Sequence, residues 1–152
     1  MKIKIKTHLF DNIELSPEIR SLLWLQMSKK IDAVLDEFYV LLQDSVYKNL
    51  LENIDVEALK SRQKQHWQKI ILHSVDDKYD ARLRRMHENH QKIGLPNRHY
   101  ITAYMYLLNK FEEAILRGSA GPKEAFKLIS ALHSIFADDI VRAIEVQCTT
   151  GE

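Results

Sequence analysis

The stretch HENHQKIGLP, residues 87–96, decides which fold the sequence predicts. It places His87 and His90 three residues apart, so the two imidazoles are neighbours on one face of a helix. Gly94 is a natural helix C-cap, and Pro96 cannot continue the helix. The segment therefore predicts an imidazole held about one turn before a sharp corner of the chain.

Helical periodicity extends from this corner in both directions. Upstream, Ser16-Pro17-Glu18 has the capping hydroxyl, the first-position proline and the early acid of a helix start. Apolar residues at helical spacing and capping residues predict further helices at about 31–42, 47–51, 55–70 and 76–93, the last opened by Asp76 and Asp77. Two long helices are expected at 97–117 and 122–147. The sequence predicts an all-α fold of about six to eight helices.

Bulk composition excludes several classes of protein. A chain of 152 residues with 45% hydrophobic and 28% charged residues is typical of one globular domain. Its net charge of +1 gives no electrostatic footprint for nucleic acid, and no apolar run reaches the ~20 residues of a membrane span. The single cysteine, Cys148, excludes a disulfide framework. The basic start has no apolar stretch behind it, so we expect a cytoplasmic protein.

The histidine pair admits three interpretations. Two polar residues on a helix surface is the simplest. A zinc site would need two histidines four residues apart with a glutamate between them, whereas His87 and His90 are three apart. A di-iron site would need the motif Glu-x-x-His, and no glutamate stands three residues before any of the seven histidines. A heme iron needs only one proximal imidazole in an apolar pocket, and His90 before the Gly94 corner suits that demand.

Two further segments carry polar residues on apolar helix faces. Tyr39 shares a face with Leu35 and Leu42, as a core tyrosine would, although its hydroxyl could also serve a heme pocket. Gln63 interrupts an apolar stripe and is either an amide at a helix crossing or a donor above a metal. His66 is either a partly exposed histidine or a second axial ligand.

Taken together, these segments resemble the globin-coupled sensor domains, which are heme globins acting as gas-sensing modules. The likeness covers about Leu15 to Ile144. It is carried by LSPEIRSLLWLQ and IDAVLDEFY near the start, by the proximal segment 75–104 with its His90-Gln91-Lys92-Ile93-Gly94-Leu95 motif, and by LISALHSIFADDIVRAI near the end.

The resemblance implies heme b as cofactor, with His90 as the proximal iron ligand and His87 one turn before it. Tyr39 would be the distal tyrosine, Gln63 would lie over the iron, and Tyr100 would lie near the proximal histidine. The implied heme walls are apolar or aromatic residues: Phe38, Leu59, Trp67, Ile70, Met86, Ile93 and Leu95. Arg62, Arg82 and Arg85 are possible partners of the heme propionates by position.

The resemblance also implies how the domain works. Residues 1–14 would be an arm, 15–147 the sensor globin domain, and 148–152 a tail leading to an output domain such as a diguanylate cyclase or a chemotaxis signalling domain. The last two helices would form a homodimer interface. The ligand would be oxygen or another diatomic gas (CO or NO), and the chain itself would be no enzyme. An enzyme-like globin, a heme-free helical interaction domain and a non-heme metal site at His87 and His90 are the alternatives.

Overall fold

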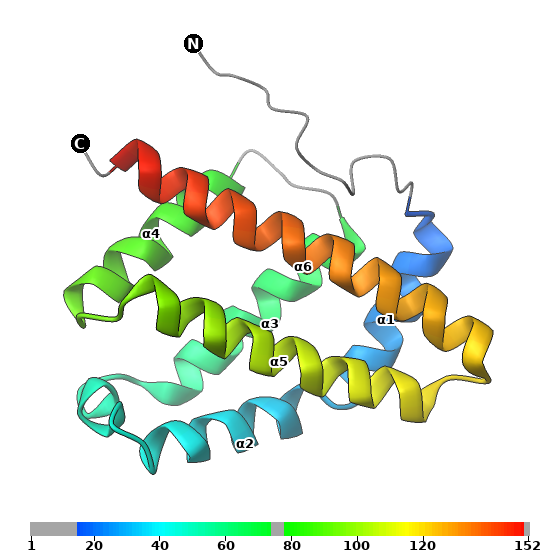
Figure 1. Ribbon diagram of the computed structural model, residues 1–152, viewed down its shortest axis with the longest axis horizontal. Helices are drawn as coiled ribbons and strands as arrows, with labels where there is room; N and C mark the ends of the chain where they lie inside the picture. The colour runs from blue at the N-terminus through cyan, green and yellow to red at the C-terminus, as the bar shows by residue number, and fades with distance from the viewer. Residues whose placement is uncertain (1–14, 74–77, 151–152) are drawn as a thin grey trace.

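The computed structural model is all-helical over the residues that it describes, 15–73 and 78–150 (Figure 1). The helices in chain order are α1 (Pro17–Ser28), α2 (Ile31–Gln43), the short 3₁₀ helix η1 (Lys48–Leu51), α3 (Val56–Leu72), α4 (Tyr79–Lys92), α5 (Asn97–Gly118) and α6 (Pro122–Thr150). The predicted all-α class is confirmed. The predicted arm at 1–14 and the predicted helix opening at Asp76 and Asp77 lie outside the described residues.

Local sequence signals set several of the helix ends. The Ser16 hydroxyl accepts a hydrogen bond from the Ile19 amide at 3.2 Å and caps α1. The Asp55 carboxylate accepts one from the Ala58 amide at 3.1 Å and caps α3. The last helix runs to Thr150, three residues beyond the predicted end at 147, because no glycine or proline lies between Pro122 and Thr150.

The two longest helices form the frame of the molecule. Figure 1 shows α5 and α6 lying side by side, with α1 at one end of the pair and α4 at the other. Helix α6 packs against α1, α4 and α5, and α2 packs against α5 and α3. Helices α3 and α4 meet where the His66 ring stacks on the Tyr79 ring, with 5.8 Å between centroids. Apart from this contact, α3 packs against α1, α2 and α6, and α4 packs against α6.

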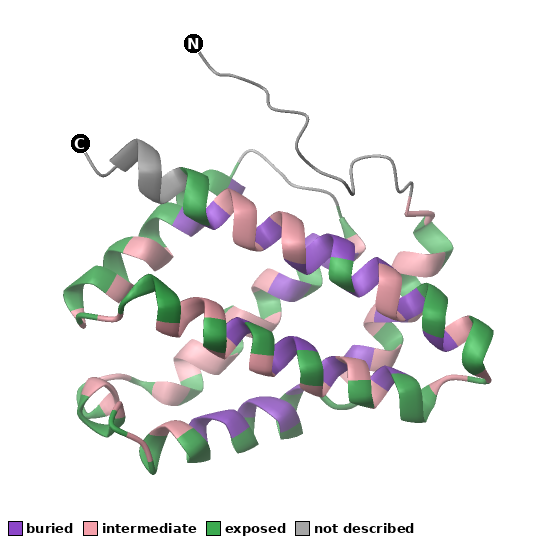
Figure 2. Cartoon of the chain, viewed as in Figure 1, coloured by how far each residue is buried: buried purple, intermediate pink, exposed green. Residues whose placement is uncertain are grey.

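The core is apolar and draws on all six α-helices (Figure 2). Its largest fully buried side chains are Tyr79, Phe111, Phe136, Leu23, Met27, Ile31, Leu35, Ile71, Leu83, Ile115, Leu128 and Leu132. Burial of this surface is the main driving force for folding. None of the described helices is long and apolar enough to cross a membrane.

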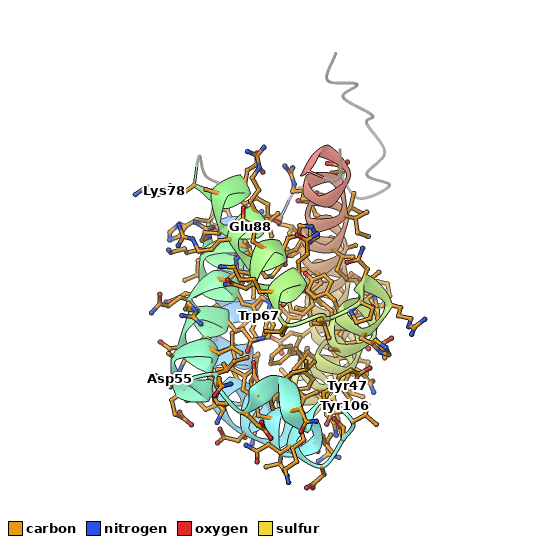
Figure 3. All side chains as sticks on the ribbon, turned by 90° about the vertical axis from the view of Figure 1, so that its left-hand side faces the viewer. Tyr47, Asp55, Trp67, Lys78, Glu88 and Tyr106 are labelled. Atoms are coloured by element: carbon orange, nitrogen blue, oxygen red, sulfur yellow. The ribbon has the colours of Figure 1, made fainter. Side chains whose placement is uncertain are left out.

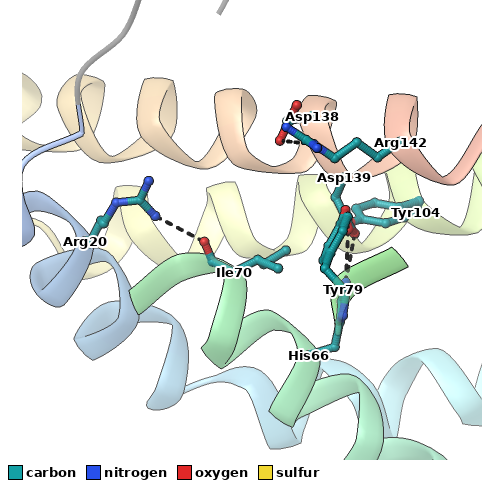
Figure 4. A network of polar contacts seen from close by, with 8 residues as sticks. All are labelled: Arg20, His66, Ile70, Tyr79, Tyr104, Asp138, Asp139 and Arg142. Carbon is teal, nitrogen blue, oxygen red and sulfur yellow. Dashed lines mark hydrogen bonds and ion pairs between the residues drawn. The ribbon is translucent and has the colours of Figure 1, made fainter. Parts of the chain in front are cut away.

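Arg20 ties the first helix to the end of the third. Its Nη1 atom donates hydrogen bonds to the carbonyl oxygens of Ile70 at 3.1 Å and Ile71 at 3.0 Å (Figure 4). The last four carbonyls of a helix have no partner within the helix, and a cation also favours the negative end of the helix dipole. One side chain of α1 thus completes the C-terminus of α3.

Candidate functional site

The corner after α4 has the geometry of a Schellman motif. Gly94 adopts a φ of 73°, in the left-handed region that glycine enters without strain. The Leu95 amide donates to the His90 carbonyl at 2.9 Å, and the Gly94 amide donates to the Gln91 carbonyl at 3.1 Å. The residue whose carbonyl receives the longer-range bond is His90 itself. The corner therefore fixes the backbone that carries this imidazole.

The His90 imidazole is kept neutral by its surroundings. The ring is half-buried and lies against Tyr100, with 5.2 Å between the ring centroids. Burial, helped by the neighbouring His87, lowers the pKa of His90 to about 4. At pH 7 the ring is therefore uncharged and carries a proton on only one of its two nitrogens. The other nitrogen has a free lone pair for a metal.

Two buried polar atoms beside His90 have no hydrogen-bond partner among the described residues. They are Nδ1 of His87 and the hydroxyl oxygen of Tyr100. Burial raises the pKa of Tyr100, so its hydroxyl keeps the proton. Buried polar groups are nearly always paired, and an exception is typical of a site that a bound group completes.

A second polar pair joins α2 to α3. The Tyr39 hydroxyl donates to Oε1 of Gln63 at 3.0 Å, and the tyrosine is only 4% exposed. Burial raises the pKa of Tyr39, while Arg62 and the bond to Gln63 oppose the rise. The phenol is therefore protonated at pH 7 and acts as a hydrogen-bond donor. Phe38 packs edge-on against its ring, 5.2 Å between centroids.

Comparison with known proteins identifies the arrangement. The family model described as Protoglobin matches residues 19–145. The chain belongs to the Protoglobin family. Its structure is similar to the globin domain of the Geobacter sulfurreducens globin-coupled sensor, with a TM-score of 0.70 and 18% sequence identity over 86% of this chain and 90% of that one. No significant match was found among curated protein sequences.

The protoglobin fold confirms the predicted globin architecture and the resemblance to sensor globins. A globin is a heme-binding and gas-binding domain, so the residues around His90 can be tested against the needs of heme. A neutral imidazole, unpaired buried atoms next to it and a protonated phenol on a separate helix all suit a neutral, largely apolar pocket with one axial ligand. The residues present fit the group.

The structure brings the site residues together as two separate pairs. Tyr39 contacts Gln63, and His90 contacts Tyr100. No hydrogen bond or ring contact joins the two pairs within the described part of the chain. In this protoglobin Gln63 stands on α3 and His90 stands on α4.

The predicted wall residues fall into two groups. Those in the half-buried group pack beside the core or at the corner after α4, and they are Leu59, Met86, Ile93 and Leu95. The core group is Phe38, Trp67 and Ile70, which are 8%, 3% and 6% exposed. Trp67 packs against Phe111 and Phe136, at centroid distances of 5.2 Å and 5.9 Å. Figure 3 shows Trp67 pointing into the interior of the protoglobin domain.

The three arginines proposed by position have different surroundings. Arg62 lies close enough to Tyr39 to lower the pKa of that phenol. The Arg82 guanidinium lies over the Tyr79 ring, 5.8 Å from its centroid. Arg85 is exposed on α4. Arg62 is therefore the one of the three that lies beside the Tyr39–Gln63 pair.

Sequence reasoning missed a buried carboxylate. Asp139, on α6, is 3% exposed and accepts hydrogen bonds from Tyr79, from Tyr104 at 2.5 Å and from Nε2 of His66 at 3.0 Å (Figure 4). Burial by itself would raise the pKa of Asp139, but the bonds from His66 and the tyrosines outweigh it and the pKa is lowered. The signal in the sequence was its register: Asp139 stands three residues after Phe136 and four before Ala143, both buried.

Proposed function

We propose that the chain is the heme-binding domain of a gas sensor, with His90 as the proximal ligand of heme b iron. The observation that carries the proposal is the His90 imidazole, which is neutral, half-buried and fixed at the Gly94 corner. A neutral imidazole is the protonation state that an iron ligand requires. His87 and Tyr100 would line the proximal side, where their unpaired atoms lie.

When bound, heme would supply an iron atom with one open axial position for a diatomic gas. Tyr39 and Gln63 would form the polar part of the pocket at that position. The Tyr39 hydroxyl can turn from Gln63 to a ligand, and the Gln63 amide nitrogen has two further protons to donate. Such donors stabilise a ligand with negative charge on its outer atom, so we propose oxygen as the preferred gas over carbon monoxide.

The proposed wall of the pocket combines the half-buried and the core residues. Phe38 and Leu59 would lie on the side of Tyr39 and Gln63, with Trp67 and Ile70 closing the interior. Met86, Ile93 and Leu95 would lie on the side of His90. Apolar walls exclude water and strengthen the hydrogen bonds from Tyr39 and Gln63.

We also propose that the domain, residues 15–147, signals as a homodimer through α5 and α6 to a cytoplasmic output domain. Leu116 and Phe126, near the turn between these helices, are 62% and 74% exposed. Large apolar side chains left on a surface are typical of an interaction site. Sedimentation of the purified chain should show a dimer, and a monomer at high concentration would count against this part of the proposal.

Absorption spectra of the purified chain test the heme proposal. The wild type, His90→Ala and His87→Ala should be reconstituted with heme and measured oxidised, reduced, and reduced under carbon monoxide. We expect a Soret band that shifts with carbon monoxide in the wild type and in His87→Ala, and a lost or altered band in His90→Ala. His87→Ala is the matched control because it removes the neighbouring imidazole.

Other outcomes select other functions. If the wild type takes up no heme, the sensor proposal is wrong and a heme-free helical interaction domain remains. If the heme-loaded chain consumes oxygen with nitric oxide or turns over peroxide when a reductant is present, the domain is an enzyme-like globin. A reduced spectrum that is already six-coordinate would direct attention to His66.

A further inference from the structure

The buried Asp139 carboxylate joins three helices to a fourth. It lies on α6, and its three hydrogen-bond donors are His66 on α3, Tyr79 on α4 and Tyr104 on α5. The donors are 73, 60 and 35 residues away in the chain. One side chain therefore connects four helices that are distant in sequence.

Each of the three donor helices also carries a residue of the proposed heme site. His66 follows Gln63 by three residues, and Tyr104 follows Tyr100 by four, so each donor lies about one turn from a site residue on the same helix. Tyr79 is the first residue of α4, the helix that carries His90 in its last turn. Asp139 thus contacts both the helix of the Tyr39–Gln63 pair and the helix of the proximal histidine.

An unbroken series of contacts runs from the proximal imidazole to α6. The His90 and Tyr100 rings are 5.2 Å apart, and the Tyr100 and Tyr104 rings are 5.9 Å apart in an edge-to-face arrangement. The Tyr104 hydroxyl then donates to Asp139 at 2.5 Å. Two tyrosine side chains therefore connect His90 to α6.

Further contacts hold the side chains around Asp139 in place. The Tyr79 ring stacks on His66, with 5.8 Å between centroids, and the Arg142 guanidinium lies 6.0 Å from the same ring. Both carboxylate oxygens accept bonds, Oδ1 from Tyr79 and Oδ2 from Tyr104. Bonds to an ionised group are short and directional, and a buried network with every member satisfied holds one geometry.

We infer that Asp139 is a positioning residue for the heme site: it sets α3 against α4 and α5 and links the proximal histidine to α6. The inference rests on the proposed function, because it assigns Asp139 a role toward a heme that His90 ligates. Asp139 would act on the site through Tyr104 and Tyr100, without a hydrogen bond to His90 itself.

The test compares Asp139→Asn with Asp138→Asn. Both variants remove one carboxylate charge from adjacent residues of α6, but Asp138 is half-buried and pairs with Arg142 at 2.9 Å. Three properties are measured: the iron–histidine stretching band of the reduced heme-loaded chain, its oxygen dissociation rate, and hydrogen exchange of the heme-free chain. The third needs no heme and reports on the helices directly.

For Asp139→Asn we expect a shifted iron–histidine band and a dissociation rate changed by about 3- to 10-fold. We also expect faster hydrogen exchange at the start of α4 and around His66. Asp138→Asn should keep wild-type values in all three. Tyr104→Phe, which removes one hydroxyl and keeps the ring, should shift the band in the same direction, and it carries the test if Asp139→Asn does not fold.

Two results would overturn the inference. Wild-type bands and rates in both Asp139→Asn and Tyr104→Phe, even with lower stability, would make Asp139 a structural residue only. Failure of the wild type itself to give a Soret band would remove the proposed function and this inference together. The wild-type spectrum therefore separates the two failures.

Discussion

Burial shifts the pKa values of two side chains of the proposed pocket in opposite directions. It raises the pKa of Tyr39, which therefore keeps its proton and can donate. It lowers the pKa of His90 to about 4. At pH 7 the imidazole therefore carries one N–H proton instead of two, and its other ring nitrogen can ligate a metal. Both side chains are uncharged at pH 7, as the low polarity of the pocket requires. One physical cause thus prepares a donor on α2 and a ligand on α4.

Replacing Tyr39 tests the donor. If its hydroxyl bonds a bound gas, Tyr39→Phe should raise the oxygen dissociation rate of the heme-loaded chain by about 5- to 30-fold, the loss of one hydrogen bond to a charged acceptor. The carbon monoxide rate should change much less. Stopped-flow or flash photolysis gives both rates.

Tyr106→Phe is the control for this substitution. Tyr106 also packs near Phe38, with 5.9 Å between centroids, but its hydroxyl faces Glu37 at the surface. Its removal should leave both rates unchanged. An unchanged oxygen rate in Tyr39→Phe together with a faster rate in Gln63→Leu would assign the donor to Gln63 instead.

At the scale of the helix, the ends of α4 and α3 are held by different means. The end of α4 is determined locally, by the left-handed Gly94 and two backbone bonds. The end of α3 is completed from a distance, by the Arg20 guanidinium on α1. The first could be predicted from the sequence and the second could not.

Gly94→Ala tests the local end. A side chain at a φ of 73° adds steric strain of about 1–2 kcal/mol, so the free energy of unfolding should fall by that amount. Urea titration followed by circular dichroism measures it. Gly121→Ala is the matched control, because neither site has an atom within 4 Å of the added Cβ but only Gly94 has a positive φ. Equal effects of the two substitutions would show that the Gly94 corner carries no strain.

The range of each interaction explains what the sequence could predict. Ser16, Asp55 and Gly94 act within five residues, and the helix end predicted from each of these three residues was confirmed. The family resemblance implied Tyr39 and Gln63 as separate members of one pocket, and the bond between them at 3.0 Å was not predicted. The partners of Asp139 could not be predicted, because no local pattern brings together residues up to 73 apart. The roles of the site residues toward heme stay predictions.

At the scale of the whole molecule, a buried negative charge links the fold to pH. Burial alone would raise the pKa of Asp139. The hydrogen bonds from His66, Tyr104 and Tyr79 favour the ionised form more strongly, so the pKa is lowered. A group with a lowered folded pKa contributes stability above its unfolded pKa. That stability is lost as the pH falls through the folded pKa.

We therefore expect the wild type to lose stability from about pH 5 downward, with the loss continuing below pH 4. Asp139→Asn should be less stable at pH 7 and should show a shallower decline over the same range. Urea midpoints at several pH values measure both slopes, with Asp138→Asn keeping the wild-type slope. Parallel slopes for Asp139→Asn and the wild type would contradict the assignment.

The length of α6 gives the position of Asp139 a mechanical consequence. The helix continues for eleven residues beyond this carboxylate, from Asp139 to Thr150. At 1.5 Å per residue, that segment is a rigid rod of roughly 16 Å. A tilt of about 5° with Asp139 as the pivot would move the far end of the rod by about 1.4 Å. A small change of angle at Asp139 is therefore enlarged at the C-terminal end of α6.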